Sequence, residues 1–181
     1  MSKVIWHVMM SLDGFIAGPD HAMEWARDAP AGPNELAAEV MRSTGAILGG
    51  RGWYDAAERK YDGVDGIYGG AWSGPVFVLT HRVGEAPDDP KTTFLDEDIE
   101  AAVARARDAA GGKNVELFGA TVARQCVDAG LVDEIIVHIA PLLLGDGVHL
   151  YGGAGAPQVD LERVSVFEAG QTTSLRFAVR R

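Results

Sequence analysis

The sequence has a single cysteine and no cluster of metal-binding side chains, and both shortages restrict its chemistry. Cys126 has no second cysteine with which to form an internal disulfide. The five histidines, at positions 7, 21, 81, 138 and 149, do not have the spacing of zinc ligands. We therefore expect a protein of a reducing compartment, most simply the cytoplasm, with no bound metal ion.

Basic residues and long apolar runs are also scarce. Sixteen Lys and Arg face 26 Asp and Glu, so the formal net charge is -10, which repels nucleic acid and anionic membranes. The N-terminal segment is interrupted by His7 and Asp13, and the apolar run 135–145 is interrupted by His138 and Pro141. The sequence therefore predicts no nucleic-acid partner, no membrane span and no signal peptide.

Several common motifs of nucleotide and ester chemistry are missing as well. The chain contains no G-x-G-x-x-G, no P-loop and no G-x-S-x-G nucleophile elbow. The zinc signature of nucleobase deaminases needs more cysteines than Cys126 provides. With 181 residues, of which 47% are hydrophobic, the chain has the size and composition of one domain, which we assign to residues 1–181.

Apolar and β-branched runs alternate with segments of helical spacing. The predicted strands are 3–9, 46–50, 74–82, 114–118 and 131–141, and the predicted helices are 34–43, one starting at 51, 96–112 and 119–130. Asn34 and Asp96 are the predicted caps of two of these helices. Two alternating segments, 161–168 and 172–180, predict a C-terminal antiparallel hairpin. This pattern indicates an α/β fold, a central mixed sheet flanked by helices on both faces.

Some of the 23 glycines lie where a predicted strand runs into a predicted helix. Gly49 and Gly50 precede the helix that starts at Arg51, and Gly119 precedes the helix of Ala120. A helix N-terminus offers unpaired N–H groups and a positive dipole end, and glycine lets a phosphate approach closely. Two such junctions can face one diphosphate. The alternative is that both are merely tight turns.

A third polar group follows the strand at 74–82. Thr80, His81 and Arg82 lie at its carboxyl end, the edge at which α/β sheets bind ligands. A hydroxyl, an imidazole and a guanidinium can each donate a hydrogen bond to a phosphate monoester, such as the 2′-phosphate of NADP. The alternative is an ordinary solvated loop.

Four segments together carry a resemblance to a known family: HVMMSLDGFIAGPD, AILGGRGWYD, PVFVLTHR and VELFGATVARQCVDAGLVDEIIVHIAPLLLGDGVHLY. They resemble the dihydrofolate reductase-like superfamily, in particular the C-terminal reductase domain of the bifunctional riboflavin biosynthesis deaminase-reductase and its stand-alone bacterial relatives. The resemblance implies a three-layer fold with a mixed, mostly parallel sheet and a C-terminal hairpin. It also implies a homodimer and NADPH as cofactor.

The resemblance assigns cofactor contacts to four segments of this chain. The implied NADPH-binding residues are Met9, Ser11, Ala17 and Gly18 beside the nicotinamide, Gly50, Arg51, Gly52 and Trp53 at the first phosphate junction, Gly119, Ala120, Thr121 and Val122 at the second, and Leu79, Thr80, His81 and Arg82 at the adenosine end. The two phosphate junctions coincide with those that the glycine pattern indicates.

The chain departs from the riboflavin-pathway domain at two positions that the family links to its sugar-phosphate substrate. Phe15 stands where the family has a lysine, and Phe118 stands where it has a glutamate. The candidate catalytic groups are Asp13, near the implied nicotinamide, and Glu35, at the start of the predicted helix 34–43. Asp13 also belongs to an Asp-Gly turn signal, so a structural role is an open alternative.

The expected activity is NADPH-dependent hydride transfer to a C=N bond of a pteridine- or pyrimidine-like compound. The family activity is reduction of 5-amino-6-(5-phosphoribosylamino)uracil in riboflavin biosynthesis. The alternatives are dihydrofolate reductase activity and a non-catalytic nucleotide-binding protein of the same fold.

Overall fold

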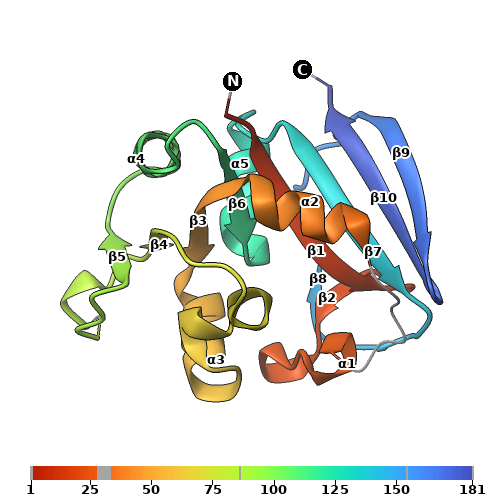
Figure 1. Ribbon diagram of the computed structural model, residues 1–181, viewed down its shortest axis with the longest axis horizontal. Helices are drawn as coiled ribbons and strands as arrows, with labels where there is room; N and C mark the ends of the chain where they lie inside the picture. The colour runs from red at the N-terminus through yellow and green to blue at the C-terminus, as the bar shows by residue number, and fades with distance from the viewer. Residues whose placement is uncertain (1, 28–33, 86, 154, 181) are drawn as a thin grey trace.

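The computed structural model describes residues 2–27, 34–85, 87–153 and 155–180. Within them, one eight-stranded sheet forms the centre of the molecule, in the order β5-β4-β3-β6-β1-β7-β10-β9 (Figure 1). Its strands are β1 (Val4–Ser11), β3 (Thr44–Gly50), β4 (Val76–Leu79), β5 (Thr92–Leu95), β6 (Asn114–Phe118), β7 (Glu134–Ala140), β9 (Leu161–Ala169) and β10 (Thr172–Val179). The six strands from β5 to β7 are parallel, and β10 is antiparallel to both β7 and β9. The predicted mixed, mostly parallel sheet with a C-terminal hairpin is confirmed.

Helices cover both faces of the sheet, as Figure 1 shows for α2 in front and α5 behind. The longer helices are α2 (Glu35–Ser43), α3 (Arg51–Lys60), α4 (Ile99–Ala109) and α5 (Ala120–Asp128). Because side chains alternate along a strand, Trp6 and Leu117 pack in the core under α4 and α5, whereas Ile5 packs with Leu36 of α2 on the opposite face. The sequence pattern of continuous apolar strands follows from this two-sided burial.

Shorter elements connect the sheet to its surroundings. They are β2 (Phe15–Ala17), η1 (Pro19–His21), α1 (Glu24–Arg27), η2 (Gly63–Gly70), η3 (Val83–Glu85) and β8 (Val148–His149). Strands β2 and β8 pair with each other in a small separate sheet. No helix in the described ranges is long and apolar enough to span a bilayer.

Of the two predicted helix caps, Asn34 is confirmed and Asp96 is wrong. Asn34 caps α2, since its side-chain oxygen accepts a hydrogen bond from the Ala37 N–H at 3.1 Å. Asp96 does not cap α4: the cap is Asp98, which accepts from the Ala101 N–H at 2.8 Å. Both carboxylates precede the same apolar pattern, and the Asp96 side chain instead contacts His81. The helix therefore begins at Ile99, two residues later than a cap at Asp96 predicts.

Strand β5 was not predicted from the sequence. It contains only four residues and lies at the edge of the sheet, so one face of it is partly exposed and its pattern is short. Its pairing with β4 places Leu95 beside Leu79. The strand predicted at 74–82 is correspondingly shorter, because it ends at Leu79 and leaves Thr80, His81 and Arg82 in the following loop.

Candidate functional site

A cavity of about 690 Å³ opens at the carboxyl ends of β3, β4 and β6. Chain direction in the sheet explains its position. From β3 the chain passes through α3 to β4, and from β6 it passes through α5 to β7, on the other side of the sheet order. Strands β3 and β6 are neighbours, so the two connections diverge from one point. Such a switch point leaves a crevice between the two helix N-termini, which is where α/β sheets bind ligands.

Both helix N-termini at this crevice lack a side-chain cap. Gly50 precedes α3 and Gly119 precedes α5, and neither position supplies an oxygen to the first-turn N–H groups. Gly119 has a φ of +88°, and a Cβ there would lie 3.3 Å from the Cβ of Trp53. A Cβ on Gly50 would lie 3.3 Å from Cγ2 of Val122, on the opposite junction. Glycine therefore lets the two junctions meet while their N–H groups remain available to an anion.

Arg51, the first residue of α3, has one nitrogen without a partner. Its Nε donates to Asp55 Oδ1 at 2.6 Å and its Nη2 donates to the Glu85 carbonyl at 3.3 Å. The guanidinium also lies 5.8 Å from the ring centre of Phe94. These contacts fix the side chain, yet Nη1 is buried and has no hydrogen-bond partner among the described residues. A buried donor without an acceptor is costly, so this nitrogen suits an anionic ligand in the cavity.

The loop after β4 brings three further polar side chains to the cavity. Thr80 is buried, and its Oγ1 accepts from the Arg82 N–H at 3.1 Å. His81 is exposed and its Nδ1 lies 3.0 Å from Asp96, while Arg82 lies 3.5 Å from Glu85. Such exposed pairs are weak, so an anion can replace the carboxylates as the partner of His81 and Arg82. The loop geometry is compatible with a phosphate contact and with the alternative of a solvated loop.

The cavity brings most of the predicted cofactor contacts together. Among its lining residues are Met9, Ala17, Gly50, Arg51, Gly52, Trp53, Leu79, Thr80, His81, Arg82, Gly119, Ala120, Thr121 and Val122. Ser11 and Gly18 are not among them. Ser11 is fully buried and donates to Asp13, and Gly18 precedes η1 and donates its N–H to the Ala22 carbonyl. These two residues shape the turns behind the cavity.

The two candidate catalytic carboxylates lie outside the cavity lining. Asp13 accepts hydrogen bonds from Ser11 Oγ at 2.6 Å and from the N–H groups of Leu144 and Gly145. These bonds, chiefly the one from Ser11, lower the pKa of Asp13 to about 2. The carboxylate thus ties the turn after β1 to the loop after β7. Glu35 begins α2 with a largely exposed side chain that lies 4.0 Å from Arg42.

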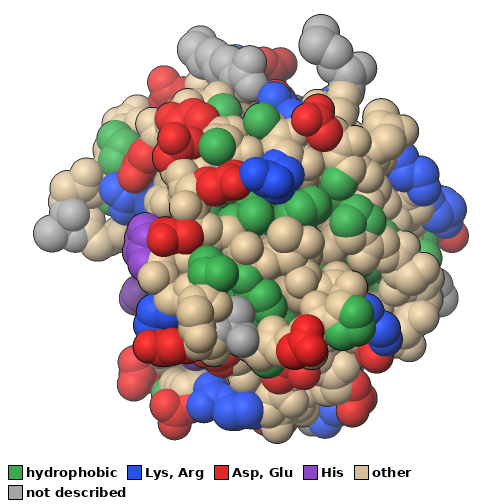
Figure 2. Space-filling view, turned by 90° about the vertical axis from the view of Figure 1, so that its left-hand side faces the viewer, with side chains coloured by type: hydrophobic (Ala, Val, Ile, Leu, Met, Phe, Trp, Pro, Cys, Tyr) green, Lys and Arg blue, Asp and Glu red, His purple; other side chains and the backbone are tan. Residues whose placement is uncertain are grey.

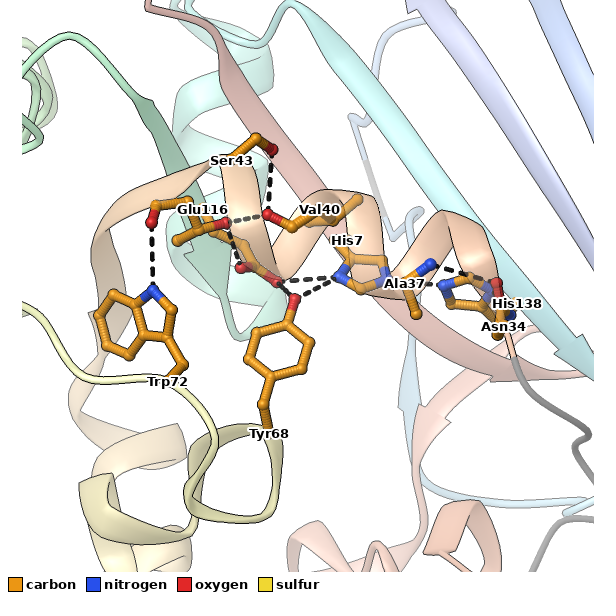
Figure 3. A network of polar contacts seen from close by, with 10 residues as sticks. His7, Asn34, Ala37, Val40, Ser43, Tyr68, Trp72, Glu116 and His138 are labelled. Carbon is orange, nitrogen blue, oxygen red and sulfur yellow. Dashed lines mark hydrogen bonds and ion pairs between the residues drawn. The ribbon is translucent and has the colours of Figure 1, made fainter.

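A row of buried polar side chains lies beneath α2 (Figure 3). At its centre is His7, whose Nδ1 lies 2.9 Å from both Glu116 Oε1 and the Tyr68 hydroxyl. His7 Nε2 lies 2.6 Å from Nε2 of His138, and Nδ1 of His138 lies 2.6 Å from the Ser174 hydroxyl. His7 also lines the cavity, so this residue connects the two.

Several lining residues are absent from the sequence prediction. They are His7, Val8, Ile16, His21, Met23, Ala56, Ala57, Tyr61, Phe118, Gln125 and Val148. Periodicity could have found some of them. His7 is two residues from Met9 on one strand, and Ala56 and Ala57 follow Trp53 at helical spacing. His21 had no such signal, because it lies in a short 3-10 turn in which it and Asp20 have positive φ.

Charge is unevenly placed over the molecule despite its net value of -10. On the side at the β5 end of the sheet, basic and acidic side chains are interspersed around a band of apolar ones (Figure 2). Arg51, Arg82 and the N-termini of α3 and α5 add local positive potential at the cavity. An anionic ligand can therefore bind there although the chain as a whole is acidic.

Comparison with known proteins gives information on both the family and the fold of this chain. The sequence model of the family described as RibD C-terminal domain matches residues 2–175. An uncharacterized protein of Bacillus subtilis strain 168, YwjB, is 22% identical over 156 residues, which is 82% of each chain.

Among solved structures, a putative riboflavin biosynthesis protein from Shewanella sp. PV-4 matches over 100% of both chains, with a TM-score of 0.81 and 21% identity. A diaminohydroxyphosphoribosylaminopyrimidine deaminase/5-amino-6-(5-phosphoribosylamino)uracil reductase from Thermotoga maritima matches with a TM-score of 0.66 and 17% identity. That match covers 99% of this chain and 57% of the other. A pyrimidine reductase-like protein from Corynebacterium diphtheriae has a TM-score of 0.63 and 13% identity over 99% and 92% of the two chains. These likenesses confirm the expected fold.

Proposed function

Because this chain belongs to the RibD C-terminal domain family, we propose that it is a reductase that uses NADPH to reduce a C=N bond of a pteridine- or pyrimidine-like compound. The observation that carries this proposal is the pair of uncapped helix N-termini, α3 and α5, at one cavity with the unpartnered Nη1 of Arg51. These groups suit the phosphates of a dinucleotide. We place the reaction in the cytoplasm, in keeping with the single cysteine.

The residues present fit the cofactor from end to end. The N-terminal turns of α3 and α5 would hold the diphosphate, and Arg51, Thr80, His81 and Arg82 would hold the adenosine end with its 2′-phosphate. Met9 and Ala17 would border the nicotinamide. When bound, NADPH supplies the hydride. The chain would align the acceptor and exclude water with apolar groups such as Trp53. The ring of Trp53 packs edge to face on that of Phe118, with the ring centres 4.9 Å apart.

The family activity, reduction of 5-amino-6-(5-phosphoribosylamino)uracil in riboflavin biosynthesis, is the first substrate to test. Two aromatic residues favour a different acceptor, because they stand where the resemblance implies a lysine and a glutamate. Phe15 stacks on His149 with ring centres 4.2 Å apart, and Phe118 packs against Trp53. Dihydrofolate is therefore the second substrate to test, and a non-catalytic nucleotide-binding protein is the remaining alternative.

NADPH binding and NADPH oxidation test the proposal separately. We expect NADPH to quench tryptophan fluorescence with a dissociation constant well below millimolar, since Trp53 lines the cavity. We also expect the absorbance of NADPH to fall with the uracil or with dihydrofolate as acceptor. Failure of NADPH to bind contradicts the reductase proposal, and binding without oxidation of NADPH by either acceptor favours the non-catalytic alternative.

Replacement of Arg51 by Ala tests which phosphate the guanidinium meets. The side chain extends towards Glu85 and Phe94, near the loop of Thr80, so we expect it to meet the 2′-phosphate. Arg51→Ala should then weaken NADPH by about tenfold and leave NADH within about twofold, measured by fluorescence titration. Arg124→Ala is the matched control, because Arg124 also pairs with a carboxylate four residues on but is not in the cavity lining. An equal loss for both cofactors places Arg51 on the diphosphate instead.

Gly50→Ala tests the approach of the two junctions. Gly50 has an ordinary φ of -94°, so alanine causes no backbone strain there, but its methyl group would lie 3.3 Å from Val122. We expect NADPH to bind at least about tenfold more weakly, with little change in the melting temperature. Gly84→Ala is the control, since a Cβ there meets nothing within 4 Å. Unchanged NADPH affinity in Gly50→Ala argues against a diphosphate between the junctions.

We also propose a homodimer, and the edge strand β9 is its expected contact. Leu161, Val164, Val166 and Phe167 on this strand are each at least 40% exposed. An apolar edge strand is a surface that proteins usually cover. Val166→Asp should convert the dimer to a monomer in light scattering, whereas Val83→Asp, at an exposed apolar residue of η3 between β4 and β5, should leave it intact. A monomeric wild type contradicts the proposal.

A further inference from the structure

The turn that carries His21 has a backbone conformation that is uncommon for residues other than glycine. His21 is the last residue of η1, and it and Asp20 have φ values of +57° and +53°. A side chain in this left-handed region costs free energy, and here two consecutive residues pay that cost. Such strain persists only where neighbouring contacts hold it, and it is concentrated at ligand sites. The contacts of this turn therefore bear on its function.

The last turn of α3 and the residue after it hold both flanks of His21. Lys60 is the last residue of α3, and its Nζ donates to the Asp20 carbonyl at 2.8 Å. Tyr61 follows the helix, and its hydroxyl accepts from the Met23 N–H at 2.6 Å. These two hydrogen bonds fasten the chain on either side of His21 to one helix.

The imidazole of His21 lies at the opposite end of the same helix. A Cβ on Gly52 would lie 3.6 Å from both Cε1 and Nε2 of His21. Gly52 is the second residue of α3, so it belongs to the first turn, which has no side-chain cap. Glycine is a poor helix former, but its missing side chain leaves the space beside this turn to the imidazole. Nε2 of His21 therefore lies close to N–H groups that suit an anion.

The ring of His21 is available to a ligand. The residue is exposed and lines the cavity. Neither of its ring nitrogens has a hydrogen-bond partner among the described residues, whereas ring nitrogens of His7, His81 and His138 do. An imidazole carries at least one N–H in both its neutral and its protonated form. His21 thus offers the cavity a hydrogen-bond donor in either form.

Resting on the proposed function, we infer that His21 is a further cofactor-binding residue, whose imidazole donates a hydrogen bond to the diphosphate of NADPH. The N-terminal turns of α3 and α5 are already proposed to hold that diphosphate, and His21 lies beside the first of them. Arg51 begins the same turn, but its guanidinium extends away towards Glu85 and Phe94. The two side chains therefore divide the phosphates: Arg51 meets the 2′-phosphate and His21 meets the diphosphate.

This division gives His21 a different binding signature from Arg51. The diphosphate is common to NADPH and NADH, whereas the 2′-phosphate is found only in NADPH. A contact from His21 to the diphosphate therefore raises the affinity for both cofactors equally. The strained turn gains a function by the same contact, because it brings a donor from η1 to the start of α3.

Four ligands locate the contact of His21. NADPH and NADH share the diphosphate, 2′-phospho-ADP-ribose has it without the nicotinamide, and adenosine 2′-monophosphate has neither. His21→Ala should weaken the first three by the same factor, about fivefold or more, and should leave adenosine 2′-monophosphate within about twofold. The dissociation constants of NADPH and NADH are measured by tryptophan fluorescence, and the other two by competition with NADPH.

A second substitution separates the ring from the turn that carries it. His21→Gly also removes the imidazole, but glycine suits the positive φ of this position. We expect His21→Gly to melt at a higher temperature than His21→Ala and to bind NADPH as weakly. His149→Ala is the matched control, because His149 is also exposed and without a hydrogen-bond partner among the described residues, but it is not in the cavity lining. It should leave all four affinities within about twofold.

The other outcomes overturn this inference in distinguishable ways. A loss confined to NADPH and NADH places His21 at the nicotinamide, and a loss that includes adenosine 2′-monophosphate places it at the adenosine end. Wild-type affinity in His21→Gly shows that the turn matters and the ring does not. Unchanged affinities in His21→Ala remove His21 from the site and leave the reductase proposal intact. Failure of the wild type to bind NADPH overturns the reductase proposal, and with it the role of His21.

Discussion

The adjacency of β3 and β6 is the constraint on which the site depends. The two strands pair in parallel, with Gly49 beside Phe118, so α3 and α5 both begin at one edge of the sheet. Their connections then run to opposite sides of the sheet order. Close approach requires glycine: a Cβ on Gly49 would lie 2.4 Å from Cε3 of Trp53. The glycines at these two junctions are therefore partly a steric requirement of the crevice, independent of any ligand that occupies it.

Much of the fold was predictable because its strands are buried on both faces. The predicted strand 114–118 coincides with the observed β6, and the helix predicted from 119 agrees with α5 to within two residues at either end. The apolar pattern did not reveal strands that are buried on one face only or that are very short. Strand β5 has four residues at an edge, and β8 has two residues in a glycine-rich loop. The start of α4 was predicted wrongly for a different reason. Both Asp96 and Asp98 are good N-cap residues, and the start at Asp98 is the one that buries Ile99.

The sequence indicates where the cavity lies, but it does not indicate the contacts among the buried polar side chains beneath α2. Junction residues such as Gly50 and Gly119 are recognisable locally, because a strand, a glycine and a helix are contiguous in the chain. The contact between His7 and Glu116 has no such local signal, because the two residues are 109 positions apart in the chain. The parallel pairing of β1 with β6 brings them together. A histidine and a glutamate in apolar strands were thus visible, but their contact requires the strand order. The resemblance indicated Asp13 as a catalytic candidate near the nicotinamide, and its Asp-Gly turn signal indicated a structural role. The contacts of Asp13 are those of a loop clamp.

The departure from the riboflavin-pathway domain at position 118 changes the chemistry of the cavity wall. The resemblance places a glutamate of the family at position 118, at the carboxyl end of β6, where this chain has Phe118 against Trp53. Side chains two apart on a strand share a face, so Glu116 lies on the same face as Phe118, deeper in the sheet by about 6.6 Å. The cavity surface thereby loses a charge and gains an apolar wall. A carboxylate remains on the same face of the strand, where it contacts His7, a residue of the cavity lining. This arrangement disfavours a ligand group that needs a carboxylate partner at the end of β6, because an apolar side chain there offers it no hydrogen bond.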